Sequence, residues 1–151
     1  MRALIIGYGN PLRSDDGFGW YAAQQIETSS HFQNIEVIAR QQLTPELAET
    51  ASHFELVIFI DAARDLSPGQ MRCDKIVPDT SRGVARPSGF THFLTPASLL
   101  AWSAALYDKF PEAYYLSVGG ERFSEGETIS ASVEAAYEPL FARVRSIIDR
   151  K

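Results

Sequence analysis

Two adjacent carboxylates follow a glycine-rich turn near the start of the chain. The stretch 4–19 reads LIIGYGNPLRSDDGFG, and its loop ends at Asp15 and Asp16. A carboxylate at this place can accept hydrogen bonds from the free amides of the next helix, so either acid can serve as a helix cap. One cap needs only one acid. The other carboxylate is therefore a candidate for proton transfer or for metal binding.

A third acid and a histidine stand at comparable places later in the chain. Asp61 ends the most apolar run of the sequence, 57–60, and His92 ends a long loop that begins at Pro78. Two carboxylates and one imidazole suit a borderline divalent metal such as nickel or zinc and leave coordination positions open for water or substrate. The sequence thus predicts a site made of Asp16, Asp61 and His92. Each residue also has a simpler interpretation, as a helix cap, a strand-end acid and a loop histidine.

The elements that must hold these residues alternate along the chain. The apolar patterns predict strands at 2–7, 35–39, 54–61, 70–77 and 114–119, and helices at 18–28, 44–51, 95–109 and 130–149. This order predicts a three-layer α/β fold, with a mostly parallel (mixed) twisted sheet of about five strands and helices on both faces. Such sheets bind ligands beyond the carboxyl ends of their strands. If the first and third strands are neighbours, Asp16 and Asp61 lie on the same rim.

Finer features of the helices are also predicted. Thr44 and Thr95 each precede a proline and are expected to cap the second and third helices. Ser130 is expected to cap the last helix, and Pro139 is expected to kink it because proline has no amide for the usual bond. The buried face of the third helix is predicted to consist of Leu99, Trp102, Leu106 and Phe110.

The composition limits the classes of function. The 151 residues fit a single domain, residues 1–151, and carry 14 Lys and Arg against 19 Asp and Glu, a formal net charge of -5. Nucleic acid and anionic membranes are therefore not expected as partners. The apolar runs are far shorter than the ~20 residues of a spanning helix, and no signal peptide is evident, so we expect the protein to be located in the cytoplasm. Cys73 is the only cysteine, which excludes an internal disulfide and favours an ordinary strand position over a nucleophile.

Several other polar residues are weaker candidates. His31 and His53 lie in polar stretches and are expected at the surface. Arg64 and Asp65 follow Asp61 closely and could position a peptide, although an exposed ion pair between them is the simpler interpretation. Gln42 could contact a substrate or form an ordinary loop hydrogen bond.

Two other classes of function remain open at this point. The segment GYGNPL after a strand imitates the glycine-rich turn of a nucleotide-binding, Rossmann-like module, and Arg40 could read a 2′-phosphate. However, Leu12 stands where the third glycine would be, and Asp15 and Asp16 would repel a pyrophosphate. A non-catalytic protein that binds metal or a partner is the other alternative.

The sequence resembles a known family over nearly its whole length. GYGNPLRSDDGFG is similar to the N-terminal signature of the hydrogenase maturation endopeptidases, the proteases that trim the C-terminus of the nickel-iron hydrogenase large subunit. The similarity continues through the strand ending at Asp61, through Pro68-Gly69, through His92 before a leucine-bearing helix, and through VEAAYEP at 133–139. The matching positions of the signature are Gly7, Gly9, Asn10, Leu12, Asp15, Asp16, Gly17 and Gly19.

This resemblance implies a function and assigns the site residues. Asp16, Asp61 and His92 match the metal-binding positions of the family, and the implied metal is nickel already placed in the precursor, with another divalent metal possible in the isolated protein. The implied partner is the large-subunit precursor, whose C-terminal peptide would lie between the glycine loop and the loop 78–92. Either the metal activates water or the scissile carbonyl while Asp16 or Asp61 transfers a proton, or the metal serves only for recognition. No Ser/His/Asp or Cys/His set offers a nucleophilic alternative.

Overall fold

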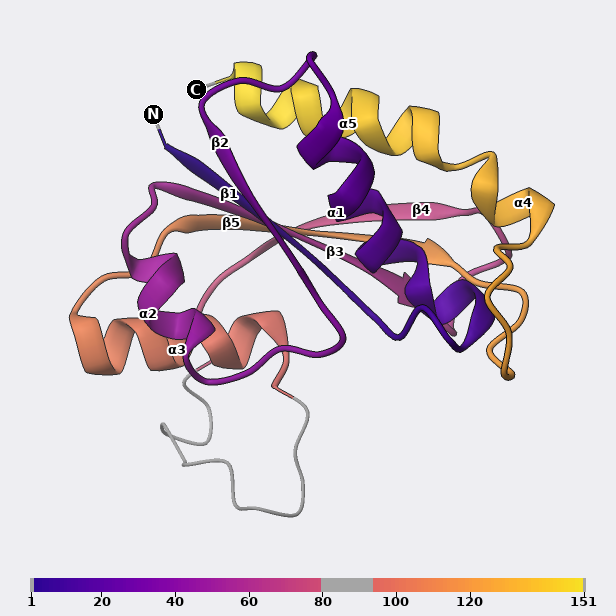
Figure 1. The fold of residues 1–151 in the computed structure, drawn as a ribbon. Helices are drawn as coiled ribbons and strands as arrows, with labels where there is room; N and C mark the ends of the chain where they lie inside the picture. The colour runs from indigo at the N-terminus through magenta and orange to yellow at the C-terminus, as the bar shows by residue number, and fades with distance from the viewer. Residues whose placement is uncertain (1, 80–93, 151) are drawn as a thin grey trace.

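The described residues form a five-stranded sheet at the centre of the molecule (Figure 1). The computed structural model describes residues 2–79 and 94–150. The strand order is β2-β1-β3-β5-β4; four strands are parallel, and β4 is antiparallel to β5 at the edge. The predicted mixed sheet and its edge strand are confirmed. The strands are β1 Ala3–Tyr8, β2 Ile35–Arg40, β3 Leu56–Ala63, β4 Met71–Ile76 and β5 Glu112–Gly119.

Helices cover both faces of this sheet, as predicted. In Figure 1, α1 and α5 lie on one side of the strands, and α2 and α3 lie on the other. Two separate apolar clusters fill the spaces between the sheet and these helices. The helices are α1 Phe18–Thr28, α2 Leu47–Ser52, α3 Pro96–Tyr107, α4 Ala131–Glu134 and α5 Tyr137–Asp149, and a 3-10 helix, η1, spans Ser14–Gly17.

The central strands are apolar on both faces because both faces are covered. In β1, Ile5 packs toward α1 and α5, whereas Leu4 and Ile6 pack toward α2 and α3. The same alternation in β3 sends Ile58 to the first cluster and Phe59 to the second. Burial on both sides produces the continuous apolar runs that marked these strands in the sequence.

The neighbouring positions of β1 and β3 bring their carboxyl ends to one rim of the sheet. Gly7 is paired with Ile60 in parallel register, so the loop after β1 begins beside the residue that precedes Asp61. The start of α1 lies close to both strands at Gly19, where an added Cβ would collide with the carbonyl oxygens of Tyr8 and Ile60. The glycine thus allows the helix, and η1 before it, to lie directly above the strand ends.

Local chemistry at the helix ends differs from the predictions in several places. The predicted bounds of α1 are confirmed, but its N-cap is Gly17 without a side-chain bond, so neither preceding aspartate caps it. The second helix begins at Leu47 rather than after Thr44, whose hydroxyl instead donates to Glu46 Oε1 at 2.7 Å. At α3 the prediction is confirmed, because Thr95 forms a reciprocal capping box with Ser98.

The C-terminal helix is divided rather than kinked at its proline. A break at residues 135–136 separates α4 from α5, and Pro139 lies in the first turn of α5, where its missing amide has no intrahelical partner to lose. Ser130 stands at the N-cap of α4 but makes no capping bond. The predicted N-cap position of Ser130 is therefore confirmed, whereas a capping bond from its side chain is absent.

The predicted buried face of α3 is also partly wrong. Leu99 is buried, but Leu106 and Phe110 are 56% and 53% exposed, and Leu100 and Ala101 are buried instead. The helix is apolar on most of its surface, so side-chain spacing alone does not select the face that meets the sheet. Every helix in the described part of the chain is too short or too polar to span a bilayer.

Candidate active site

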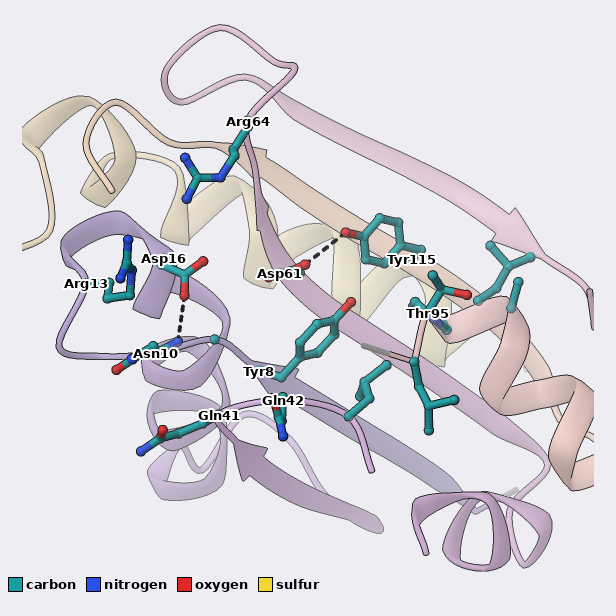
Figure 2. Close-up of a pocket in the computed structure, with 16 residues that line it drawn as sticks. Tyr8, Asn10, Arg13, Asp16, Gln41, Gln42, Asp61, Arg64, Thr95 and Tyr115 are labelled. Carbon is teal, nitrogen blue, oxygen red and sulfur yellow. Dashed lines mark hydrogen bonds between the residues drawn. The ribbon is translucent and has the colours of Figure 1, made fainter. Parts of the chain in front are cut away.

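A cleft of about 970 Å³ opens on the rim where β1 and β3 end, and Figure 2 shows its interior. Asp16 reaches it from η1 and Asp61 from β3, so the structure brings together two of the three predicted site residues. His92, the third, lies outside the described residues. The other residues lining the cleft are Tyr8, Gly9, Asn10, Arg13, Gln41, Gln42, Leu43, Arg64, Ile76, Leu94, Thr95, Pro96, Ala97 and Tyr115.

Asp61 is half-buried and accepts a small number of hydrogen bonds. Its Oδ1 accepts a bond from the amide of Ala62 at 2.8 Å, and its Oδ2 accepts one from the Tyr115 hydroxyl at 3.1 Å. Burial raises the pKa of Asp61 to about 7, and the charge of Asp16 adds to the rise, although the bonds from Ala62, Tyr115 and Tyr8 oppose it. A carboxyl group with this pKa can both give and take a proton near neutral pH.

Two tyrosines that the sequence analysis did not single out flank this carboxyl group. The hydroxyls of Tyr8 and Tyr115 point toward Asp61 in Figure 2. Burial, together with the charge of Asp61, raises the pKa of each hydroxyl well above its ordinary value, so both remain protonated donors. A faint signal was present in the sequence, because Tyr8 has the strand parity of the buried Leu4 and Ile6 and continues their face into the cleft.

Asp16 presents one free oxygen to the cleft. Its Oδ2 accepts a bond from the amide of Asn10 at 2.9 Å, and Oδ1 has no hydrogen-bond partner among the described residues. The turn that supplies this amide is fixed in its own right, since Asn10 Oδ1 accepts a bond from the amide of Leu12 at 2.9 Å. Gly9 makes the turn possible with a φ of +144° and with its Cα packed against the backbone of Asp16.

The adjacent Asp15 has an entirely different role. It is 0% exposed and accepts bonds from the amides of Glu121, Arg122 and Ser130 and from the Ser130 hydroxyl, at 2.7–2.9 Å. Burial alone would raise the pKa of Asp15, but the bonds from Ser130, Glu121 and Arg122 outweigh it and lower the pKa below its usual value. Asp15 therefore ties the loop after β5, and the start of α4, to the glycine loop. The prediction that an acid at this place caps α1 is wrong for Asp15 and for Asp16.

The described residues supply two carboxylates, but no complete ligand set, for a metal ion. Within residues 2–79 and 94–150, no group of three His, Cys, Asp or Glu side chains is placed to hold one. The outward oxygen of Asp16 and the carboxyl group of Asp61 share one cleft. The hard oxygen donors suit a divalent ion whose remaining ligands come from elsewhere.

The weaker candidates fall into two groups. His31 and His53 are exposed, as predicted, and Cys73 is a half-buried strand residue whose thiol pKa is raised by burial, which disfavours the thiolate. The predicted pair of Arg64 with Asp65 is wrong, because Asp65 pairs with Arg72 at 3.2 Å. Arg64 and Gln42 instead line the cleft.

Comparison with known proteins identifies the fold. No family model and no curated protein matches the sequence. The structure is similar over 100% of both chains to the hydrogenase 2 maturation peptidase of a Thaumarchaeota archaeon, with a TM-score of 0.74 and 21% identity. The chain has the fold of the hydrogenase maturation proteases. The hydrogenase maturating endopeptidase HybD of E. coli matches 99% of this chain and 93% of its own, with a TM-score of 0.72 and 22% identity. HycI of Thermococcus kodakarensis, a [NiFe] hydrogenase maturation protease, matches 98% of this chain and 92% of its own, with a TM-score of 0.73 and 17% identity.

Proposed function

We propose that the protein is an endopeptidase that removes the C-terminal peptide of a nickel-loaded hydrogenase large-subunit precursor, in the cytoplasm. The proposal depends chiefly on one observation, the convergence of Asp16 and Asp61 in a cleft where the pKa of Asp61 is raised to about 7. The glycine-loop signature in the sequence and the shared fold with hydrogenase maturation proteases support the same conclusion.

In this proposal the nickel belongs to the substrate. Asp16 offers its free Oδ1, Asp61 its carboxyl group, and His92 an imidazole. Two acids and one imidazole form a weak, open site, which suits a nickel ion that the precursor already holds through other ligands. The protease would then bind the loaded precursor in preference to the empty one.

The roles of the two carboxylates in catalysis follow from their surroundings. Asp61, with a pKa near neutral and two tyrosine hydroxyls beside it, is suited to take a proton from water and return it to the leaving amine. The carboxylate of Asp16 accepts a single hydrogen bond from the described residues and is suited to binding the substrate metal. If the metal serves recognition alone, Asp61 remains the group that moves the proton.

Nucleotide binding, the rival from the sequence, has less support. A phosphate on a glycine-rich turn accepts bonds from loop amides. Here the Asn10 amide already donates to Asp16 Oδ2, so an acid occupies that place. Arg40 bonds its own neighbour, the carbonyl of Ala39, at 2.9 Å. A non-catalytic binding protein is the remaining alternative, and the activity of the purified chain decides between it and the protease.

The test is incubation of the purified chain with the precursor, with and without inserted nickel. Loss of the C-terminal peptide from the loaded form only supports the proposal. Asp16→Asn, Asp61→Asn and His92→Ala should each abolish processing with the fold intact, and Asp149→Asn, an exposed acid at the end of α5, serves as the matched control. Binding of the loaded precursor without cleavage would favour the non-catalytic alternative. Tight nicotinamide binding without cleavage would favour the nucleotide module.

A further inference from the structure

Two arginines line the cleft and form no ion pair with an acid among residues 2–79 and 94–150. Arg13 and Arg64 contribute to the same cleft as Asp16, and Figure 2 shows their guanidinium groups on the Asp16 side of the site. The ion pairs found in the described part of the chain involve neither of them. Two cations on the wall of a cleft in a chain with a net charge of -5 require an explanation.

Both side chains start from a fixed framework. The guanidinium of Arg64 lies 4.1 Å from the centre of the Phe123 ring, and stacking of this kind leaves the N–H edge free to donate. The backbone of Arg13 is held by two bonds, from its amide to the Asn10 carbonyl at 3.0 Å and from the Asp16 amide to its own carbonyl at 3.1 Å. Preorganised donors lose little freedom when a ligand binds.

The opposite end of the cleft has a different character. Asp61, Tyr8 and Tyr115 lie between the arginines and Thr95 in Figure 2. The residues around Thr95 that line the cleft, Leu94, Pro96 and Ala97, are apolar, and Leu43 and Ile76 also contribute apolar surface. The cleft therefore has a cationic end, a reactive centre and an apolar end.

We propose that Arg13 and Arg64 form a subsite for a carboxylate of the peptide substrate, with an apolar residue of the same peptide at the Thr95 end. The planar fork of each arginine matches a carboxylate, and two such groups can bind it from both sides. The inference rests on the proposed function, since it names the chemistry of the peptide that the cleft receives. The carboxylate comes either from the C-terminus of the precursor or from an acidic side chain close to the cleaved bond.

A competing interpretation is that the arginines only offset the charges of Asp16 and Asp61. In that case, loss of either arginine would change the pH dependence of processing, and the size of this effect would be the same for charged and neutral peptides. For a carboxylate subsite, the effect must be larger for a peptide that carries the carboxylate. The dependence on peptide charge therefore separates the two interpretations.

A binding experiment tests the subsite without relying on cleavage. The arginine Nε–Hε resonances are followed by NMR while a leucine-containing tetrapeptide is added to millimolar concentration. Three versions of the peptide are compared: one with a free carboxyl terminus, one with an amidated terminus, and one that is amidated but carries an internal glutamate. Saturable shifts of the Arg13 and Arg64 signals with a carboxylate peptide, absent with the neutral peptide, are expected. In Arg64→Gln the shift of the remaining Arg13 signal should be weakened or lost. Equal shifts with the neutral peptide, or none with any peptide, would overturn the subsite.

Processing kinetics then connect the subsite to the substrate. Arg13→Gln and Arg64→Gln should each raise KM for the loaded precursor about tenfold with kcat nearly unchanged. Arg145→Gln is the matched control, because Arg145 also lies over an aromatic ring, that of Phe32, but outside the cleft. An unchanged KM in both cleft variants would overturn the assignment.

Changes in the precursor identify the source of the carboxylate. A neutral Gly-Ser extension displaces the terminal carboxylate, whereas Asn and Gln replacements neutralise acidic side chains near the cleaved bond. The change that raises KM in the wild-type protease but adds nothing to Arg64→Gln identifies the source; full additivity of both changes would overturn the proposal. If the wild-type chain processes no precursor, the proposed function fails, and the peptide titration alone decides the subsite.

Discussion

Asp15 is a fully buried carboxylate and Asp61 a half-buried one on the same rim, and their surroundings differ in the number of hydrogen-bond donors. Asp15 accepts four hydrogen bonds and its pKa is lowered, whereas Asp61 lies against two tyrosines and its own neighbouring amide, and burial raises its pKa to about 7. The first environment stabilises a permanent charge. The second gives Asp61 a pKa close to neutral pH, so its protonated and charged forms are both populated. The comparison shows that burial by itself does not mark a reactive acid, because the donors around the carboxyl group decide its role.

The neighbours Asp15 and Asp16 diverge for a local reason. Ser14 takes a left-handed backbone conformation, with a φ of 54°, at the start of η1, and its amide donates to the Gly126 carbonyl at 2.7 Å. After this turn, Asp15 points into the interior and Asp16 toward the cleft. One short helix thus supplies both a structural anchor and a candidate ligand.

The largest expected effect is on activity. Asp61→Asn keeps the size of the side chain but cannot exchange a proton, so we expect processing of the loaded precursor to fall on the order of 10³-fold. Asp15→Asn should keep most of its activity per folded molecule. The measurement is the initial rate of tail removal, normalised to folded protein by circular dichroism. Similar losses in the two variants would remove the distinction between anchor and reactive acid.

The next largest effect is on stability. Asp15→Asn replaces one carboxylate oxygen by an NH₂ group, which must then face at least the donor amide of Ser130, and it removes the charge that all four bonds stabilise. We expect the free energy of unfolding to fall by about 3 kcal/mol at neutral pH. Urea unfolding measures it. Because the native pKa of Asp15 is lowered, the wild-type chain has its full extra free energy of unfolding over the variant above the unfolded pKa of about 4. This difference disappears as the pH falls through the native pKa. An advantage that persisted under acid would contradict the anchor role.

Asp61→Asn should show the opposite dependence on pH. The native pKa of Asp61 is raised, so between about pH 4 and pH 7 the unfolded chain loses this proton first, and wild-type stability falls as the pH rises. The variant lacks this term and should gain about 2 to 4 kcal/mol relative to wild type on going from pH 4 to pH 8. Urea unfolding at both values measures it. A constant difference between the two proteins would mean that Asp61 has an ordinary pKa.

The smallest expected effect belongs to Tyr115. Its hydroxyl donates to Asp61 at 3.1 Å and opposes the rise in the pKa of that carboxyl group. Tyr115→Phe should therefore shift the acid limb of the rate profile to higher pH and lower the rate at neutral pH about tenfold. Tyr114→Phe, at the neighbouring position of β5, is the control. An unshifted profile would limit Tyr115 to a packing role.

The layered fold and one part of the site could be predicted from the sequence because they depend on local patterns. Apolar runs on both faces of β1 and β3 indicate covered parallel strands, and parallel neighbours bring their carboxyl ends to one rim. The shared cleft of Asp16 and Asp61 follows from that topology. The start of α3 was predicted for the same reason, since its cap and proline are adjacent in the sequence.

The remaining features depend on contacts between distant residues. The partners of Asp15 are more than 100 positions away, at Glu121, Arg122 and Ser130, and no local pattern indicates them. Tyr115 is 54 positions from Asp61. The exposed Leu106 shows the same limit, because an apolar helix does not reveal which side another layer will cover. Long-range partners thus decide which acid has a lowered pKa and which has a raised one.

Carbon-13 NMR titration of the individual aspartate carboxyl groups in the wild-type chain tests this distinction most directly. We predict a midpoint near pH 7 for Asp61 and a midpoint below the usual aspartate value of about 3.9 for Asp15. Ordinary midpoints for both residues, or a higher midpoint for Asp15 than for Asp61, would contradict the assignment of anchor and reactive acid.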